Sequence, residues 1–194
     1  GGGGWGGRPR RVGARRVGRA GLVVGPAGWG AGLPQADAGG LAPNLFRPGR
    51  GDPYEDIGSF RSQSISSYGG KLLRIDPLTG HGLPSNPFYN GDVNAKRSKI
   101  FAYGLRNPWR FSIKPNTGST NPSAGSPGTL YIGNLGLNAW EALAVVRTGG
   151  PNFGWPCYEG PNPLADFVTP PPGHTGRGPF GPAPHPSPWA PPPP

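Results

Sequence analysis

Arg106 and Asn107 carry side chains whose chemistry suits the binding of an anionic ligand. The guanidinium of Arg106 is a planar fork of hydrogen-bond donors that suits carboxylate oxygens and stays charged at any working pH. Asn107 adds an amide donor and an amide acceptor. Pro108 disfavours helical backbone at Asn107, which helps to fix a turn there. Taken by themselves, the two residues are more typical of a solvated arginine in an ordinary turn, and an anion-binding turn is the alternative.

Short clusters of apolar and aromatic residues, bounded by Gly, Pro or Asn, surround this pair between about residues 46 and 160. Five clusters are predicted strands: Lys71–Asp76, Lys99–Tyr103, Trp109–Lys114, Thr129–Ile132 and Glu141–Val146. In the third, strict alternation predicts that Trp109, Phe111 and Ile113 share one face. Turn signals separate the strands, for example Asp76–Gly80. Short strands, tight turns and no long helix predict an all-β protein.

The two ends of the chain differ from this central segment. Residues 1–45 are rich in Gly, Ala and Arg, and residues 161–194 hold fourteen prolines. Neither can bury much apolar surface, so both are predicted to be disordered tails. The basic tail leaves RNA binding open as an alternative, and the proline-rich tail could bind an SH3- or WW-type domain. Because the chain begins with Gly and lacks Met, a fragment, a processed form or the product of an incomplete gene prediction is expected.

The net charge of +10 does not indicate a nucleic-acid-binding domain. Residues 1–50 hold eight arginines and one aspartate, a net +7, whereas residues 51–194 contribute only +3. No specific nucleic-acid partner is therefore predicted for the central segment. The single cysteine, Cys157, allows neither an internal disulfide nor a cysteine-based metal cluster. No apolar run is long enough for a membrane span or a signal peptide.

Four stretches, taken in order, carry a resemblance to a known family. They are Gly69–Tyr89, Tyr103–Phe111 (Tyr-Gly-Leu-Arg-Asn-Pro-Trp-Arg-Phe), Leu130–Glu141 and Gly149–Gly160. In this order and spacing they resemble the glucose/sorbosone dehydrogenases, a family that includes the Hedgehog-interacting-protein-like proteins. The resemblance implies a six-bladed β-propeller, of which residues 46–160 would form about two blades. It also implies a secreted or extracellular location.

The resemblance implies a site for pyrroloquinoline quinone (PQQ) and Ca²⁺. Arg106, Asn107 and Asn134 match cofactor-binding positions of the family, where many relatives carry a carboxylate instead of Asn134. The backbone carbonyls of Leu135 and Gly136 match the positions that bind Ca²⁺, a hard ion that accepts main-chain oxygens well. Glu141 could tie this loop through hydrogen bonds. Trp155, Phe153 and Tyr158 are interpreted as packing residues.

The implied activity is oxidation of a sugar at its anomeric carbon, with hydride transfer to the quinone. The family's catalytic His lies upstream of Lys71, and none of His81, His174 and His185 matches it. A general base within reach of the sugar is required for this chemistry, so no catalytic residue is predicted and the chain alone is expected to be inactive. The alternative is a non-catalytic propeller of the Hedgehog-interacting-protein-like branch that serves as a binding module.

Overall fold

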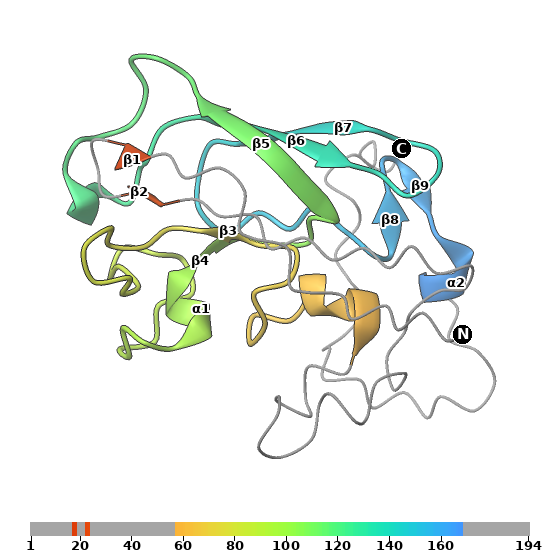
Figure 1. The fold of residues 1–194 in the computed structure, drawn as a ribbon, viewed down its shortest axis with the longest axis horizontal. Helices are drawn as coiled ribbons and strands as arrows, with labels where there is room; N and C mark the ends of the chain where they lie inside the picture. Colours follow the sequence, from red (N-terminus) through yellow and green to blue (C-terminus); the bar gives the residue numbers. More distant parts are fainter. Residues whose placement is uncertain (1–16, 19–21, 24–56, 169–194) are drawn as a thin grey trace, which may run out of the picture.

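A computed structural model describes residues 17–18, 22–23 and 57–168 of the chain. Within them, short strands dominate and helices are few and brief (Figure 1). The strands are β1 Val17–Gly18, β2 Leu22–Val23, β3 Leu72–Leu73, β4 Ile100–Ala102, β5 Asn107–Ile113, β6 Leu130–Leu135, β7 Ala142–Val146, β8 Tyr158–Glu159 and β9 Asn162–Pro163. The helices are η2 Gly58–Ser62, α1 Lys96–Lys99, η3 Pro122–Ala124 and α2 Ala165–Val168. The β-rich character predicted from the sequence is confirmed, whereas the number of blades stays a prediction.

The largest sheet is an antiparallel meander of β5, β6 and β7, with β6 in the middle. A separate pair, β3 and β4, lies below it in Figure 1, and β8 pairs with β9 close to α2. Each of the five predicted strands overlaps one of β3 to β7. No helix within the described residues has both the length and the apolar character needed to cross a bilayer.

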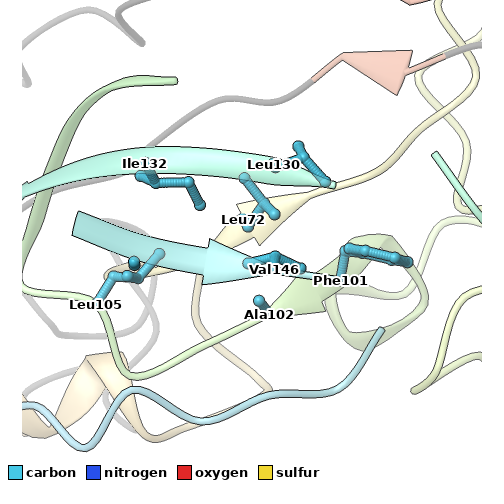
Figure 2. Packing of buried hydrophobic residues seen from close by; sticks show 8 residues of the cluster. Leu72, Phe101, Ala102, Leu105, Leu130, Ile132 and Val146 are labelled. Atoms are coloured by element: carbon cyan, nitrogen blue, oxygen red, sulfur yellow. The ribbon is translucent and has the colours of Figure 1, made fainter. Parts of the chain in front are cut away.

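The main core lies between these two sheets. Side chains of β3 and β4 meet those of β6 and β7, as Figure 2 shows for Leu72, Phe101, Leu130 and Val146. Leu130, Ile132, Ala144 and Val146 alternate along their strands and are at most 2% exposed, the period-2 pattern expected of a half-buried sheet. The sheet that carries Asn107 and Asn134 is thereby anchored on one face.

Trp109 departs from the predicted alternation. Phe111 and Ile113 pack against the core, but the register of β5 against β6 shifts between Pro108 and Arg110, so Trp109 has no partner opposite it in the described sheet. An extra residue in one strand bends it and redirects a side chain. Trp109 is consequently 54% exposed, and the prediction that it shares the face of Phe111 and Ile113 is wrong.

Lys71 is fully buried and braces the turn before β3. Its ammonium donates to the carbonyl oxygens of Arg61, Ser62 and Gly69 at 2.7, 2.8 and 2.6 Å. Three acceptors match the three protons of an ammonium group. Because burying a charge is costly unless it is hydrogen-bonded, these three carbonyls make the buried position of Lys71 possible.

Arg74 is the second fully buried cation. Its guanidinium donates to Ser85 Oγ at 2.9 Å, to Asn86 Oδ1 at 2.8 Å and to the Pro122 carbonyl at 2.5 Å. Burial lowers the pKa of Arg74 below its ordinary value. Its hydrogen bonds tie β3 to the turn at Pro122, which is 48 residues further along the chain.

A set of long-range hydrogen bonds, here called the clasp, joins the start of the described segment to its end. Ser62 Oγ and Gln63 Nε2 both donate to the carbonyl of Trp155 at 2.5 Å. Gln63 and Asn152 also exchange side-chain hydrogen bonds of 3.1 and 2.8 Å. The clasp fixes Trp155 beside the turn that carries Arg106.

The packed structure continues past residue 160. Phe167 of α2 contacts the ring of Phe60 at 5.8 Å and that of Trp155 at 5.9 Å, between ring centroids. Of the two predicted tails, residues 1–45 and 161–194, the structure describes only residues 17–18, 22–23 and 161–168. The predicted binding of RNA and of SH3- or WW-type domains concerns residues that lie mostly outside the described ones.

Candidate metal and cofactor site

The five residues predicted for the site lie together at one end of the β5–β6 pair. Arg106 directly precedes β5, Asn107 opens it, and Asn134 and Leu135 end β6, with Gly136 immediately after. Asn107 pairs with Leu135 in the antiparallel register. The sheet therefore brings together two stretches that are almost 30 residues apart in the sequence.

Asn134 organises the backbone of the Arg106–Asn107 turn. Its Oδ1 accepts the amide protons of Arg106 and Asn107 at 3.2 and 3.1 Å. Only an acceptor can satisfy both amides, and asparagine and aspartate each provide one. Asn134 thus acts on the turn itself, while the half-buried side chain of Asn107 has no side-chain hydrogen bond recorded within the described residues.

The guanidinium of Arg106 lies against the loop that follows β6. Its Nη1 donates to the carbonyl oxygens of Leu135, at 3.3 Å, and Gly136. The guanidinium carbon Cζ lies over the ring of Trp155, 5.3 Å from its centroid, in a cation–π contact. Its Nε is buried and has no acceptor among the described residues. Burial lowers the pKa of Arg106 despite the opposing field of Glu159, but a guanidinium stays protonated at any working pH.

Glu159 holds the loop from its other side. Its Oε1 accepts the amide of Leu137 and those of Asn138, Ala139 and Trp140 at 2.9, 3.3 and 3.4 Å. Burial disfavours the charged carboxylate, but the four amides outweigh burial and hold the pKa of Glu159 below its ordinary value. Successive amides facing one anion form a concave nest.

Gly136 is required by the tightness of this loop. A Cβ built on it would lie 1.7 Å from the carbonyl oxygen of Trp140 and 2.5 Å from Glu159 Oε1. Backbone atoms cannot yield at that separation, so only glycine fits between the two groups. The amides of the loop consequently face Glu159, while the carbonyls of Leu135 and Gly136 face Arg106.

A small cavity of about 20 Å³ adjoins Arg106, enough for roughly one water molecule or one metal ion. Its lining comes from the turn before β5, from β6, β7, the loop after β6 and the segment around β8: Arg106, Asn134, Gly136, Trp140, Ala142, Ala144, Phe153, Trp155, Tyr158, Glu159 and Gly160. The cavity is far too small for a three-ring quinone, which would have to contact side chains outside it.

The donor set fits a hard cation in part. Two main-chain carbonyls converge on one positively charged nitrogen, and main-chain oxygens are good ligands of Ca²⁺. Ca²⁺ takes six to eight oxygens, and the described residues include no group of three His, Cys, Asp or Glu side chains placed to hold a metal. The carbonyls could therefore contribute to a Ca²⁺ site, completed by ligands from other molecules, only where Arg106 does not occupy them.

The histidines are not part of this arrangement in the described structure. His81 lies in the turn after Asp76, where its amide bonds Thr79 Oγ1 at 3.2 Å, and it does not line the cavity. His174 and His185 lie outside the described residues.

Two functional features were not predicted from the sequence: the role of Glu159 and the contact of Trp155 with Arg106. Glu141 was expected to tie the loop, but Glu141 is exposed, and the carboxylate that accepts from the loop amides is Glu159. A signal was available, because Glu159 stands in the aromatic run Phe153–Gly160, where a carboxylate is seldom buried without a partner.

Comparison with known proteins gives a match over most of the described segment. The family model described as Glucose / Sorbosone dehydrogenase matches residues 49–166. The HIPL2 protein of Arabidopsis thaliana is 31% identical over 136 residues, which cover 61% of this chain and 18% of that protein. The HIPL1 protein of the same plant is 29% identical over 127 residues, covering 59% and 16%. The chain thus spans less than a fifth of the length of these relatives.

Two solved structures show a weaker spatial similarity. The PQQ-bound form of aldose sugar dehydrogenase from Streptomyces coelicolor gives a TM-score of 0.41 at 28% identity, over 55% of this chain and 26% of that one. An oxidoreductase (glucose dehydrogenase) from Thermus thermophilus gives 0.39 at 29% identity, over 53% and 27%.

Proposed function

Because the chain belongs to the glucose/sorbosone dehydrogenase family, we propose that it supplies part of the cofactor-binding site of a PQQ-dependent sugar dehydrogenase. In this proposal residues 46–160 form about two blades of a six-bladed propeller, and the full-length protein oxidises a sugar at its anomeric carbon. When bound, PQQ supplies the electron acceptor for the hydride of that carbon. The residues of this chain bind and orient the cofactor and its metal ion.

The observation that carries the proposal is the convergence of two loop carbonyls on Arg106. Leu135 and Gly136 direct their oxygens at one positive charge, as a cation site requires. Asn134 fixes the turn that presents Arg106 and Asn107, whose side chains offer donors to the carboxylates and carbonyls of the quinone. Glu159 holds the loop in the shape that directs its carbonyls toward Arg106.

This chain alone is proposed not to oxidise the sugar. A general base must lie within hydrogen-bond reach of the sugar hydroxyl. Among the described residues that line the cavity the only carboxylate is Glu159, which already accepts four amides, and none of them is a histidine. The base would come from another part of the full-length protein.

The lack of a free general base among the described residues that line the cavity favours one alternative, a non-catalytic binding module of the Hedgehog-interacting-protein-like branch. The similarity to the HIPL2 and HIPL1 proteins is consistent with it. The two hypotheses differ in one measurable property, since a binding module needs no quinone at Arg106.

Quinone binding by the whole chain tests the proposal. The purified protein is titrated with PQQ in the presence of Ca²⁺, and binding is followed by quenching of tryptophan fluorescence. We expect saturable binding that Arg106→Ala weakens by about tenfold or more, the loss expected for hydrogen bonds to a charged partner. Arg110→Ala is the matched control, because Arg110 is exposed and opposite Gly133 on the same strand pair. Absence of binding would favour the binding module, and sugar-dependent reduction of a dye would contradict the proposed lack of turnover.

A further inference from the structure

The loop after β6 already holds a cation, and that cation belongs to the protein. The carbonyls of Leu135 and Gly136, the two positions proposed to bind a metal ion, both accept from Nη1 of Arg106. A divalent ion bound to the same oxygens would lie within a few ångströms of the guanidinium. Like charges at that separation repel strongly in a partly buried site, so the metal ion and Arg106 cannot share the two carbonyls.

The bound position of Arg106 is incompletely satisfied. Within the described part of the chain its Nε is buried without an acceptor, and the carboxylate nearest to the loop, Glu159, is committed to the amides of residues 137–140. A buried donor without a partner destabilises the conformation that contains it. If Arg106 faced an anion instead, its Nε could find an acceptor. A competing cation could therefore displace Arg106 from the carbonyls of Leu135 and Gly136.

We propose that Arg106 is a resident cation that competes with the metal ion: its guanidinium occupies the carbonyls of Leu135 and Gly136 in the metal-free protein, and a divalent ion displaces it. The displaced guanidinium then becomes available to the carboxylates of the quinone. This inference rests on the proposed function and assigns Arg106 two successive partners. The displacement of Arg106 makes the metal ion and the anionic cofactor bind cooperatively, because each favours the conformation in which Arg106 has left the two carbonyls.

Metal binding in the absence of the quinone tests the competition directly. Tb³⁺ replaces Ca²⁺ as the probe, because its emission is sensitised by nearby tryptophans, and Trp140 and Trp155 both line the cavity. The full chain is titrated as wild type, Arg106→Met and Arg110→Met. Methionine keeps an unbranched side chain as far as the ε position, but it has no charge and no donor for the carbonyls.

We expect Arg106→Met to bind Tb³⁺ about tenfold more tightly than wild type, or more, and Arg110→Met to resemble wild type. The gain should persist at about 1 M salt, where the Debye length is about 3 Å and distant charges no longer contribute. Equal affinity of wild type and Arg106→Met would overturn the competition and leave the proposed metal site standing. Absence of Tb³⁺ binding in both would overturn the metal site as well.

A second measurement needs no variant of Arg106. The emission of Trp155 is obtained as the difference between wild type and Trp155→Phe. Saturating Ca²⁺ should change this emission, because the guanidinium leaves the indole ring whose centroid it now approaches to 5.3 Å. Ca²⁺ that displaces bound Tb³⁺ without changing this emission would show that Arg106 stays in place, and would overturn the inference.

Discussion

Glu159→Gln is the substitution that most sharply tests how the loop after β6 is held. The carboxylate is only 5% exposed, and its Oε1 accepts four consecutive amides, from Leu137 to Trp140. Glutamine keeps the shape and one carbonyl acceptor but removes the negative charge. The substitution therefore isolates the contribution of charge from that of packing.

The magnitude follows from the kind of hydrogen bond that is lost. Bonds to a charged acceptor stabilise by about 1.5–3 kcal/mol and neutral ones by about 0.5–1.5 kcal/mol. The four amides share one oxygen, so the differences do not add fully. We expect the free energy of unfolding to fall by about 1–2 kcal/mol at neutral pH, which lowers the Tm of a segment of this size by about 4–8 °C.

The same substitution should remove part of the acid sensitivity of the fold. Because the folded pKa of Glu159 lies below its ordinary value, its carboxylate stabilises the fold above the pKa of the unfolded chain. This stabilisation disappears as pH falls from about 4.3, the value for a free glutamate, through the lower folded pKa. The Tm difference between wild type and Glu159→Gln should therefore be largest near neutral pH and shrink in acid.

Thermal unfolding followed by circular dichroism between pH 3 and pH 7, a range set by the titration of glutamate near about 4.3, measures both effects. Glu141→Gln is the matched control, since it removes the same charge from an exposed residue close to the same loop. A Glu159→Gln protein with the Tm of the control at neutral pH, or a Tm difference that does not change with pH, would refute the assignment of Glu159 as the residue that holds the loop.

Three further outcomes are expected. Gly136→Ala should destabilise the fold by about 1–3 kcal/mol through overpacking against the backbone of Trp140. Gly133→Ala is the control and should not destabilise it, because its Cβ would lie 3.7 Å from its nearest neighbour. Equal melting temperatures of the two variants would contradict the tight loop. Lys71→Met should cost about 3 kcal/mol because three carbonyls, of which that of Ser62 is buried, lose their charged donor. The exposed Lys114→Met is the control in denaturant titrations. Cys157 is 3% exposed and burial raises the pKa of its thiol, so an aromatic disulfide reagent should label it about a hundredfold more slowly in native than in unfolded protein; similar rates would disprove its burial.

The strands of this chain could be predicted from the sequence because their signal is local. Alternation of apolar residues and flanking turn residues indicated all of β3 to β7. The bulge at Trp109 could not be predicted, because it depends on the register chosen with β6. The burial of Lys71 and Arg74 was equally hidden, since their partners are carbonyls and side chains of other segments, up to 48 residues away.

The candidate site was predictable to the extent that its residues lie in two motifs. Sequence similarity placed Arg106, Asn107, Asn134, Leu135 and Gly136 in one site, and the structure brings all five together. It did not reveal that Arg106 bonds the two carbonyls itself, because a motif specifies positions and not which donor takes which acceptor. For Glu159 the local aromatic run indicates that the carboxylate has a partner, but the partner itself lies about 20 residues away in sequence and could not be predicted.

The clasp has a consequence for the order in which the molecule folds. Ser62 and Trp155 are 93 residues apart, and closing so long a loop costs more conformational entropy than pairing neighbouring strands. The meander of β5, β6 and β7 should form first and the clasp late. Since the segment that carries Trp155 and Glu159 would pack in place only when the clasp forms, the surroundings of Arg106 would be completed in one of the last folding steps. Pulsed hydrogen exchange should show the amides of residues 130–133 protected before those of residues 137–140, and the reverse order would exclude this sequence of events.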